Sequence, residues 1–199
     1  MTLQSKLADP SVTIEALGAW LDGLDHAGRM AALATTTKAQ QSKLWDLAVG
    51  GGPLGLDYFV PTNLPNLTEV IHHGRNTLPA FNSFQKRFTR GADGTIFGYN
   101  EGGTRWLIGP GYFVLIPTTG NPEWEKRGPL VVDYFQVPTG PTPDGWPGIR
   151  ANHVGLQVVV YYHTRDFMRR VSKNVSIGKA YKNESDLNNW FTLIREDRA

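Results

Sequence analysis

The sequence predicts an α+β fold in which N-terminal helices pack on a curled antiparallel β-sheet or a small, about eight-stranded β-barrel. Apolar residues recur every three or four positions in the first 50 residues, as in helices, and from Thr95 onward they follow the two-residue period of strands. Several of the expected strands are also apolar on both faces. Such strands are covered on both sides, one face lining an interior and the other lying under helices.

Composition limits the class of protein. The chain has 199 residues, 40% of them hydrophobic, with 6 Trp, 7 Tyr and 9 Phe, which is enough for one domain with a packed core. The absence of cysteine excludes a disulfide scaffold, a cysteine-ligated zinc site and a thiol nucleophile. No apolar run approaches the roughly 20 residues that cross a bilayer, and the first residues lack the apolar stretch of a signal peptide. We therefore expect a soluble, cytoplasmic protein.

Charge is nearly balanced over the whole chain but not along it. The net charge of +2 argues against a nucleic-acid partner. Residues 163–183 hold six Lys or Arg and one Asp, whereas residues 1–69 hold four basic and seven acidic side chains. The basic segment is either a weak site for phosphate-like anions or a row of solvated cations on exposed strand faces.

The first 50 residues read as a helical N-terminal annex. Asp9-Pro10 fits the start of a helix, and apolar residues then follow at helical spacing, namely Ile14, Leu17, Leu21 and Leu24. The run Gly50-Gly51-Gly52-Pro53 is the clearest break and indicates a hinge or linker. We divide the chain into an annex over residues 1–50 and a barrel-like domain over residues 51–199.

The second part is expected to hold one helix and then only strands. The helix is placed near 78–88, where Leu78, Phe81, Phe84 and Phe88 share a face. Turn sequences rich in glycine and proline separate the segments that follow. The expected strands are Thr95–Tyr99, Thr104–Ile108, Tyr112–Ile116, Leu130–Val137, His153–His163, Phe167–Val171, Val175–Lys182 and Asn189–Glu196.

Most known catalytic signatures are missing from the sequence. It has no Gly-x-Ser-x-Gly elbow, no His-Glu-x-x-His pair, no phosphate-binding Walker loop and no calcium loop. Its histidines also lack the spacing of metal ligands, since His72 and His73 are adjacent and point to opposite faces of a strand. We therefore expect neither a metal site nor a cofactor.

Asp133 stands out because it shares a strand face with Val131 and Phe135. A carboxylate on an apolar face must be paired, hydrogen-bonded or protonated. The sequence suggests Arg105 first and His163 second as its partner. The pairing is either a structural ion pair at the barrel rim or part of a catalytic site, in which Asp133 works with His153 or His163 as an acid–base pair.

Aromatic residues with polar tips are frequent in the expected strands. A barrel of about eight strands is wide enough either to be filled by side chains or to hold one small ligand, and the sequence leaves that choice open. We predict binding of a small, largely apolar ligand, with an anionic group as an option, inside the barrel. The expected contacts are Arg105, Trp106, Tyr112, Tyr134, Tyr162 and Arg169.

The alternatives are the metal-independent enzyme described above and an interaction module that docks through its N-terminal helices. Ligand identity, oligomeric state and pathway are not encoded in any pattern of the sequence.

Overall fold

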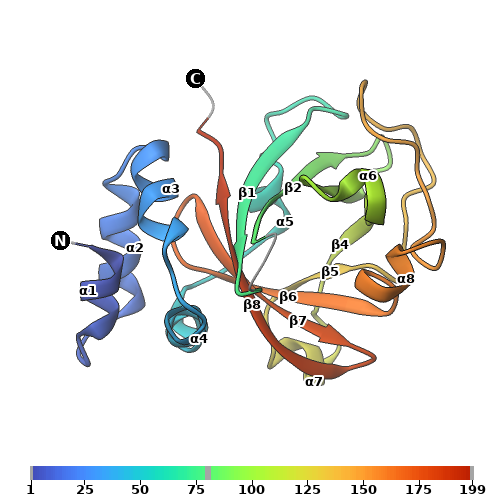
Figure 1. The fold of residues 1–199 in the computed structure, drawn as a ribbon. Helices are drawn as coiled ribbons and strands as arrows, with labels where there is room; N and C mark the ends of the chain where they lie inside the picture. Colours follow the sequence, from blue (N-terminus) through green and yellow to red (C-terminus); the bar gives the residue numbers. More distant parts are fainter. Residues whose placement is uncertain (1, 79–81, 198–199) are drawn as a thin grey trace.

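A closed antiparallel barrel forms the body of the molecule (Figure 1). The computed structural model describes residues 2–78 and 82–197. The strands follow one another around the barrel in chain order, and β1 pairs with β8 to close it. The fold class predicted from the sequence is thereby confirmed. The strands are β1 Val70–Asn76, β2 Ser83–Arg90, β3 Ile96–Glu101, β4 Phe113–Pro117, β5 Leu130–Asp133, β6 Thr164–Arg170, β7 Val175–Lys182 and β8 Ser185–Arg195.

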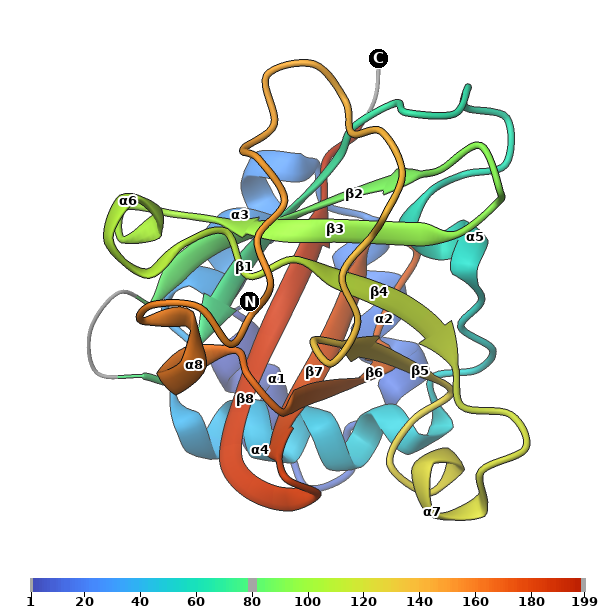
Figure 2. The same ribbon diagram turned by 90° about the vertical axis from the view of Figure 1, so that its right-hand side faces the viewer.

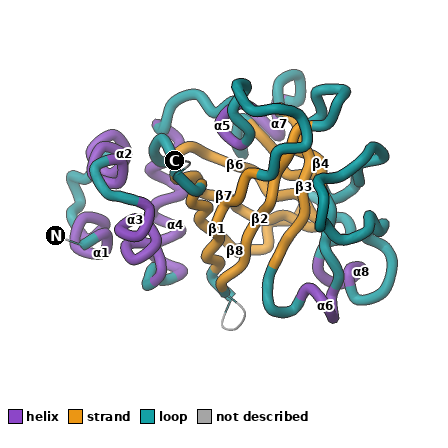
Figure 3. Tube along the Cα trace, turned by 90° about the horizontal axis from the view of Figure 1, so that it is seen from above, coloured by secondary structure: helices purple, strands orange, loops and turns teal. Residues whose placement is uncertain are grey.

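Four N-terminal helices lie together on one side of the barrel, with α4 next to the strands (Figures 1 and 3). Each begins at a side chain that accepts a hydrogen bond from the backbone of the first turn. These N-caps are Thr2, Thr13, Asp25 and Thr37. The helices are α1 Leu3–Ala8, α2 Ile14–Asp22, α3 His26–Ala34 and α4 Lys38–Leu47.

The apolar stripes of the helices cover the outer face of the strands. Leu17, Leu21 and Leu44 are fully buried and belong to one core cluster with Phe167 and Ile177, which lie on β6 and β7. Each such leucine contributes about 1.5–3 kcal/mol through the apolar surface it removes from water. The expectation that Leu130–Val137 is covered on both sides is correct for β5, because Val131 belongs to this cluster and Val132 to the cluster inside the barrel.

Within the glycine run after the helices, Gly51 is packed closely against the barrel. A short 3-10 turn, η1 Ala48–Gly50, extends α4 toward the barrel. A side chain at Gly51 would collide with the backbone carbonyl of Arg170 at the end of β6. Glycine is needed here because two stretches of backbone meet closely.

The expected helix near 78–88 is wrong, since β2 runs from Ser83 to Arg90; residues 79–81 lie outside the described part of the chain. Phe84 and Phe88 are four residues apart, a spacing that places two side chains on one face of a helix and equally on one face of a strand. Between them, Lys86 also points inward. Because Lys86 is charged, this segment lacks the alternation of apolar and polar residues by which a strand is recognised in a sequence. Pairing with β1 and β3 fixes the strand.

Two expected strands are also wrong. Part of Thr104–Ile108 forms the single helical turn α6 Arg105–Ile108, and part of His153–His163 forms α8 Gln157–Val160. Both α6 and α8 lie near one end of the barrel (Figure 2). The predicted number of strands agrees with the structure only because β1 and β2 replace these two segments.

Two further short helices flank the barrel. Leu56–Phe59 forms α5, and Pro122–Glu125 forms α7. Phe59 is fully buried and belongs to the core cluster inside the barrel, so α5 helps to fill the interior. None of the helices in residues 2–78 and 82–197 has the length and apolarity to cross a membrane.

Candidate functional site

The barrel interior is divided into a filled half and a hollow half. The filled half is packed with side chains from α5 and the strands, with the rings of Phe59, Phe88 and Phe113 about 5 Å apart. His72 is buried among them, and its Nε2 lies 3.1 Å from the backbone oxygen of Phe59. Burial lowers the pKa of His72 to about 3. The ring is therefore neutral near pH 7 and donates its proton to the carbonyl.

Three cross-strand pairs of glycine and phenylalanine shape the interior. Gly74 faces Phe84, Gly98 faces Phe113 and Gly178 faces Phe191 in the strand register. In each pair the aromatic ring occupies the space that a side chain on the glycine would take. These rings lie flat over the neighbouring strand, and those of Phe84 and Phe191 form walls of the hollow half.

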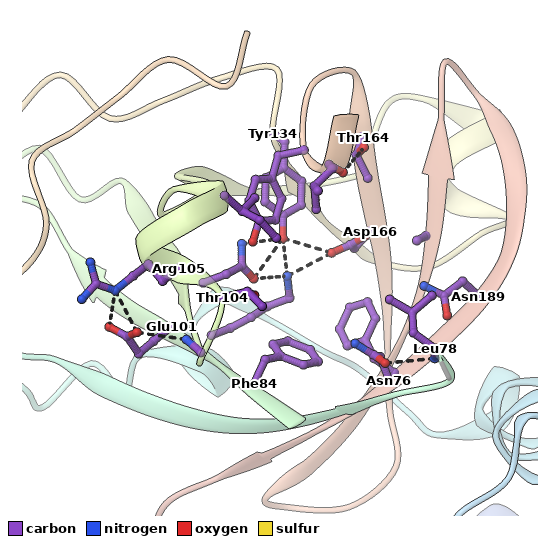
Figure 4. Close-up of a pocket in the computed structure, with 18 of the residues that line it drawn as sticks. Asn76, Leu78, Phe84, Glu101, Thr104, Arg105, Tyr134, Thr164, Asp166 and Asn189 are labelled. Atoms are coloured by element: carbon purple, nitrogen blue, oxygen red, sulfur yellow. Dashed lines mark hydrogen bonds and ion pairs between the residues drawn. The ribbon is translucent and has the colours of Figure 1, made fainter. Parts of the chain in front are cut away.

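The hollow half is a cavity of about 420 Å³, within the usual size range of small-molecule sites (Figure 4). Its walls are mainly apolar, and they come from strands on all sides of the barrel together with α6 and the end of α8. Exposed apolar side chains also line it, namely Leu78, Leu187 and, at the end of α8, Val160.

Lys86 is the unusual residue of the cavity, since its side chain is only 2% exposed. Its Nζ lies 3.0 Å from Asn100 Oδ1 and 3.0 Å from Asp166 Oδ2, and it also donates to the hydroxyl of Tyr134. An ammonium group has three protons, and each has an acceptor here. Lys86 and Asp166 thus form a buried ion pair at the inner end of the cavity.

The neighbours of the ion pair are held in place by further hydrogen bonds. Asn100 Nδ2 donates to the backbone oxygen of Gly111 at 3.0 Å and to the Tyr134 hydroxyl at 3.1 Å. The Tyr134 hydroxyl lies 3.3 Å from Asp166 Oδ2, and the ring of Tyr161 stacks on that of Tyr134 with centroids 5.3 Å apart. A polar network connected in this way keeps its geometry without a ligand.

The electrostatics of the cavity keep its phenols neutral and weaken the charged state of its amine. Burial lowers the pKa of Lys86, and the nearby Asp166 carboxylate opposes that change. Four aromatic rings surround Nζ with centroids at 5.0–5.7 Å, which partly replaces its lost hydration. Burial, with a smaller effect of Asp166, raises the pKa of Tyr134 and of Tyr161. Both hydroxyls therefore remain available as donors.

Asp166 has one carboxylate oxygen to spare. Its Oδ2 carries both contacts described above, whereas Oδ1 accepts no hydrogen bond from any residue that the structure describes. Asp166 lines the cavity, as does Tyr161. A bound molecule that carries a hydrogen-bond donor can therefore reach an acceptor at the inner end.

Two of the six predicted ligand contacts line this cavity, namely Tyr134 and Arg105. Arg105 lies at the edge, where its Nε is 2.7 Å from Glu101 Oε2 (Figure 4). Trp106 is 81% exposed on α6. Tyr112 is buried against Tyr99 and donates to the backbone of Pro147.

The remaining two predicted contacts lie among other groups. Tyr162 stacks on His163 with centroids 3.8 Å apart. Arg169 lies over the ring of Trp45 and donates to the backbone oxygen of Trp45 at 2.9 Å and that of Arg127 at 3.1 Å. Arg169 therefore ties the helical annex to the barrel.

Asp133 is buried on the outer face of β5, and its partner is Arg165 rather than Arg105 or His163. Arg165 Nε lies 3.4 Å from Asp133 Oδ1, and the same oxygen accepts from the backbone of Phe135 at 2.9 Å. His163 pairs through Nδ1 with Asn183 at 2.9 Å, and His153 is exposed beside Tyr162. Within the described residues, neither histidine has a hydrogen bond or ion pair with Asp133.

The basic segment 163–183 is largely used for internal contacts. Arg165 pairs with Glu184, and Lys179 Nζ lies 2.6 Å from Asp186 Oδ2. Lys182 donates to the backbone oxygens of residues 158 and 159, so it fastens α8 to the end of β7. The cations of this segment thus mainly bind strands and helices together.

The sequence did contain a signal for Lys86 and Asp166. Lys86 stands between Phe84 and Phe88 at strand spacing, and Asp166 precedes Met168 in the same way. A charged residue on an apolar strand face is the argument that singled out Asp133. The spacing of the phenylalanines in 78–88 favours a helix, so the sequence does not show Lys86 as an inward-facing strand residue. Asp166 stands out in the sequence only as the one acid in a basic stretch.

Comparison of the chain with known protein families, with curated proteins and with solved structures found no match in any of the three. Among the described residues there is also no group of three or more His, Cys, Asp or Glu side chains arranged to hold a metal ion. The cavity and its ion pair are thus the features from which a function must be argued.

Proposed function

We propose that the protein binds a small, mainly apolar molecule in the hollow half of the barrel, with an oxygen-bearing head group next to Lys86 and Asp166. The observation that carries this proposal is the buried ion pair at the inner end of a mainly apolar cavity. Taking two charges out of water costs several kcal/mol per ion, and apolar residues of similar volume would usually stabilise a core better. An ion pair placed beside empty space is better explained by ligand recognition than by stability.

The available hydrogen-bonding groups favour a neutral head group. Lys86 is paired with Asp166, and Arg105 is paired with Glu101, so an anionic ligand would have to displace a carboxylate from its cation. A hydroxyl can instead donate to Asp166 Oδ1, and a carbonyl can accept from the hydroxyl of Tyr161. The apolar body of the ligand would lie against Phe84 and Phe191.

The mouth supports entry of an apolar molecule directly from water. The exposed side chains of Leu78, Val160 and Leu187 line the cavity and give such a molecule its first contacts. We retain the cytoplasm as the proposed location, on the basis of the cysteine-free composition.

The proposal is tested with 2-naphthol, a neutral fluorescent alcohol, by fluorescence titration and calorimetry. Ala180 lines the cavity on β7, opposite Asp166, so Ala180→Leu adds bulk inside the cavity while Lys86 and Asp166 are both retained. Ala19→Leu, at an exposed position of α2, is the matched control. We expect wild-type and Ala19→Leu to bind equally and Ala180→Leu to lose binding. Absence of binding by the wild type, or equal binding by Ala180→Leu, would contradict the proposal.

A further inference from the structure

The inner end of the cavity holds a primary amine in a place where a ligand's head group would lie. We propose that Lys86 captures aldehydes, forming a reversible covalent imine with a mainly apolar aldehyde that enters the cavity. This inference rests on the proposed function, because it assigns the chemistry of the head group in the same site. It concerns only the reactivity of one residue and adds no second cavity.

Position is the first argument. Lys86 is the one lysine among the described residues that line the cavity, and its nitrogen lies among aromatic rings rather than in water. A carbonyl carbon bound at the inner end meets this nitrogen at the end of a chain that is already immobilised by three hydrogen bonds. Pre-organisation of this kind removes much of the entropic cost of bringing two reacting groups together.

The second argument is that a proton acceptor is already in contact with the amine. Asp166 Oδ2, 3.0 Å from Nζ, takes one proton from the ammonium and leaves a neutral amine with a free electron pair. That pair attacks the carbonyl carbon, forming the C–N bond while the carbonyl π electrons move to oxygen. A proton then passes from nitrogen to this oxygen, which gives a neutral carbinolamine.

Loss of water completes the sequence. Asp166 returns its proton to the carbinolamine hydroxyl, the C–O bond breaks, and the nitrogen electron pair forms the C=N bond. The overall change converts an aldehyde and a lysine ammonium into a protonated imine and one water molecule, with no oxidant or reductant. The Asp166 carboxylate remains as the counter-ion of the new cation, so the cavity keeps its charge balance.

The surroundings favour the product as well as the reaction. Apolar walls hold little water, and hydrolysis of an imine requires water. Burial also lowers the pKa of Lys86, which eases removal of its proton. Lys179 offers a contrast on the same barrel, since it is also paired with an aspartate, Asp186, and lies over the ring of Trp190, but it is not part of the cavity lining.

The experiment uses the full chain with 2-naphthaldehyde and sodium cyanoborohydride, which converts an imine into a stable amine. Intact-mass spectrometry reads the addition, which equals the aldehyde mass less one oxygen atom, and peptide mapping locates it. Lys86→Arg keeps a cation beside Asp166 but removes the reactive amine, and Lys179→Met is the matched control. We expect modification of Lys86 at least about tenfold faster than of Lys179, loss of the single addition in Lys86→Arg, and its retention in Lys179→Met.

A competition arm separates this inference from the function on which it rests. An excess of 2-naphthol should slow the modification of Lys86 in the wild type, because both molecules need the same cavity. If 2-naphthol binds but Lys86 is not modified, or if modification follows the exposure of the lysines, the imine proposal is wrong and ligand binding stands. If neither compound binds, the proposed function fails and this inference fails with it. Peptide mapping of the wild type decides the question even where Lys86→Arg does not fold.

Discussion

The two halves of the barrel interior are built from the same strands, but the polar groups in one half are neutral and those in the other include an ion pair. In the filled half, β1 contributes His72, which burial keeps neutral and which donates one hydrogen bond to a backbone carbonyl. In the hollow half, β2 and β6 contribute Lys86 and Asp166, a pair of opposite charges beside empty space. His72 and Lys86 are direct cross-strand partners, so the filled half and the hollow half of the interior meet between these two residues.

This difference separates the parts of the interior that stabilise the fold from the part that is available for a ligand. Apolar packing, with the few polar groups kept neutral, lowers the free energy of the folded state. A buried ion pair beside a cavity makes the folded state less stable than apolar packing would. It does, however, place polar groups at defined positions next to the cavity. Substitutions in the two halves should therefore have different effects on stability and on ligand binding.

The largest expected effect is in the filled half. Phe88→Ala removes a fully buried ring that contacts Phe59 and Phe113, and we expect a loss of about 3–5 kcal/mol in the free energy of unfolding. Phe84→Ala removes a ring that already borders the cavity, so it should cost roughly 1–2 kcal/mol. Urea unfolding measures both. Equal losses would mean that the hollow half is as tightly packed as the filled half.

The ion pair should behave as a unit. Asp166→Leu alone leaves Lys86 buried without its carboxylate, and we expect a loss of about 3 kcal/mol. The double variant Lys86→Met/Asp166→Leu removes both charges and should lie within about 1 kcal/mol of the wild type or above it. The double variant should nevertheless bind 2-naphthol more weakly, since the head group loses Asp166. Unfolding curves and titrations of the same preparations test both statements.

His72 predicts how stability depends on pH in the filled half. Burial lowers its pKa from 6.5 to about 3, so between these values the unfolded chain binds a proton that the folded chain does not. Stability from this residue is complete above about pH 6.5 and is lost as the pH falls toward 3. The loss amounts to about 2–3 kcal/mol at pH 4.5. His72→Gln should flatten the curve of unfolding free energy against pH, whereas His153→Gln, at an exposed position, should leave it as in the wild type.

The smallest expected effect is on the outside of the barrel. Asp133→Asn keeps an acceptor for the backbone of Phe135 but loses the charge opposite Arg165, which should cost about 1–2 kcal/mol. Because Asp133 is not part of the cavity lining, binding of 2-naphthol should be unchanged. Loss of binding at unchanged stability would instead place Asp133 in the functional site, as the enzyme hypothesis requires.

The sequence predicted the architecture better than the site. The apolar stripe of Ile14–Asp22 depends on local pattern and was correctly predicted, but this helix begins after Thr13, and Asp9, the expected N-cap, ends the preceding helix α1. The barrel was foreseen from short strands joined by tight turns and from Tyr112–Ile116 and Leu130–Val137, which are apolar on both faces and overlap β4 and β5. Strand β2 was missed because its inward positions mix aromatic rings with Lys86, and a four-residue spacing of phenylalanines does not distinguish helix from strand.

The site could not be located from the sequence because its members come together only when the barrel closes. Lys86 and Asp166 are 80 residues apart, and they are joined by Asn100 from β3 and by Tyr134, which directly follows β5. Tyr134 was predicted from its aromatic ring and polar tip, without reference to these partners. Arg105 was assigned to Asp133, but the α6 turn that carries it places it beside Glu101 instead.

The pairs of glycine and phenylalanine have a consequence for the range of molecules that the barrel can hold. Because the ring of Phe191 lies in the space above Gly178, the position of that cavity wall is set from the neighbouring strand. Any side chain at Gly178 would push the ring inward and shrink the cavity, and a smaller residue at 191 would widen it, with every hydrogen bond of the Lys86 network left in place. Residues 178 and 191 thus set the size of the ligand, whereas the Lys86 network binds its head group. Substitutions at 178 and 191 can therefore change the length and bulk of the bound molecule without changing the groups that bind its polar end.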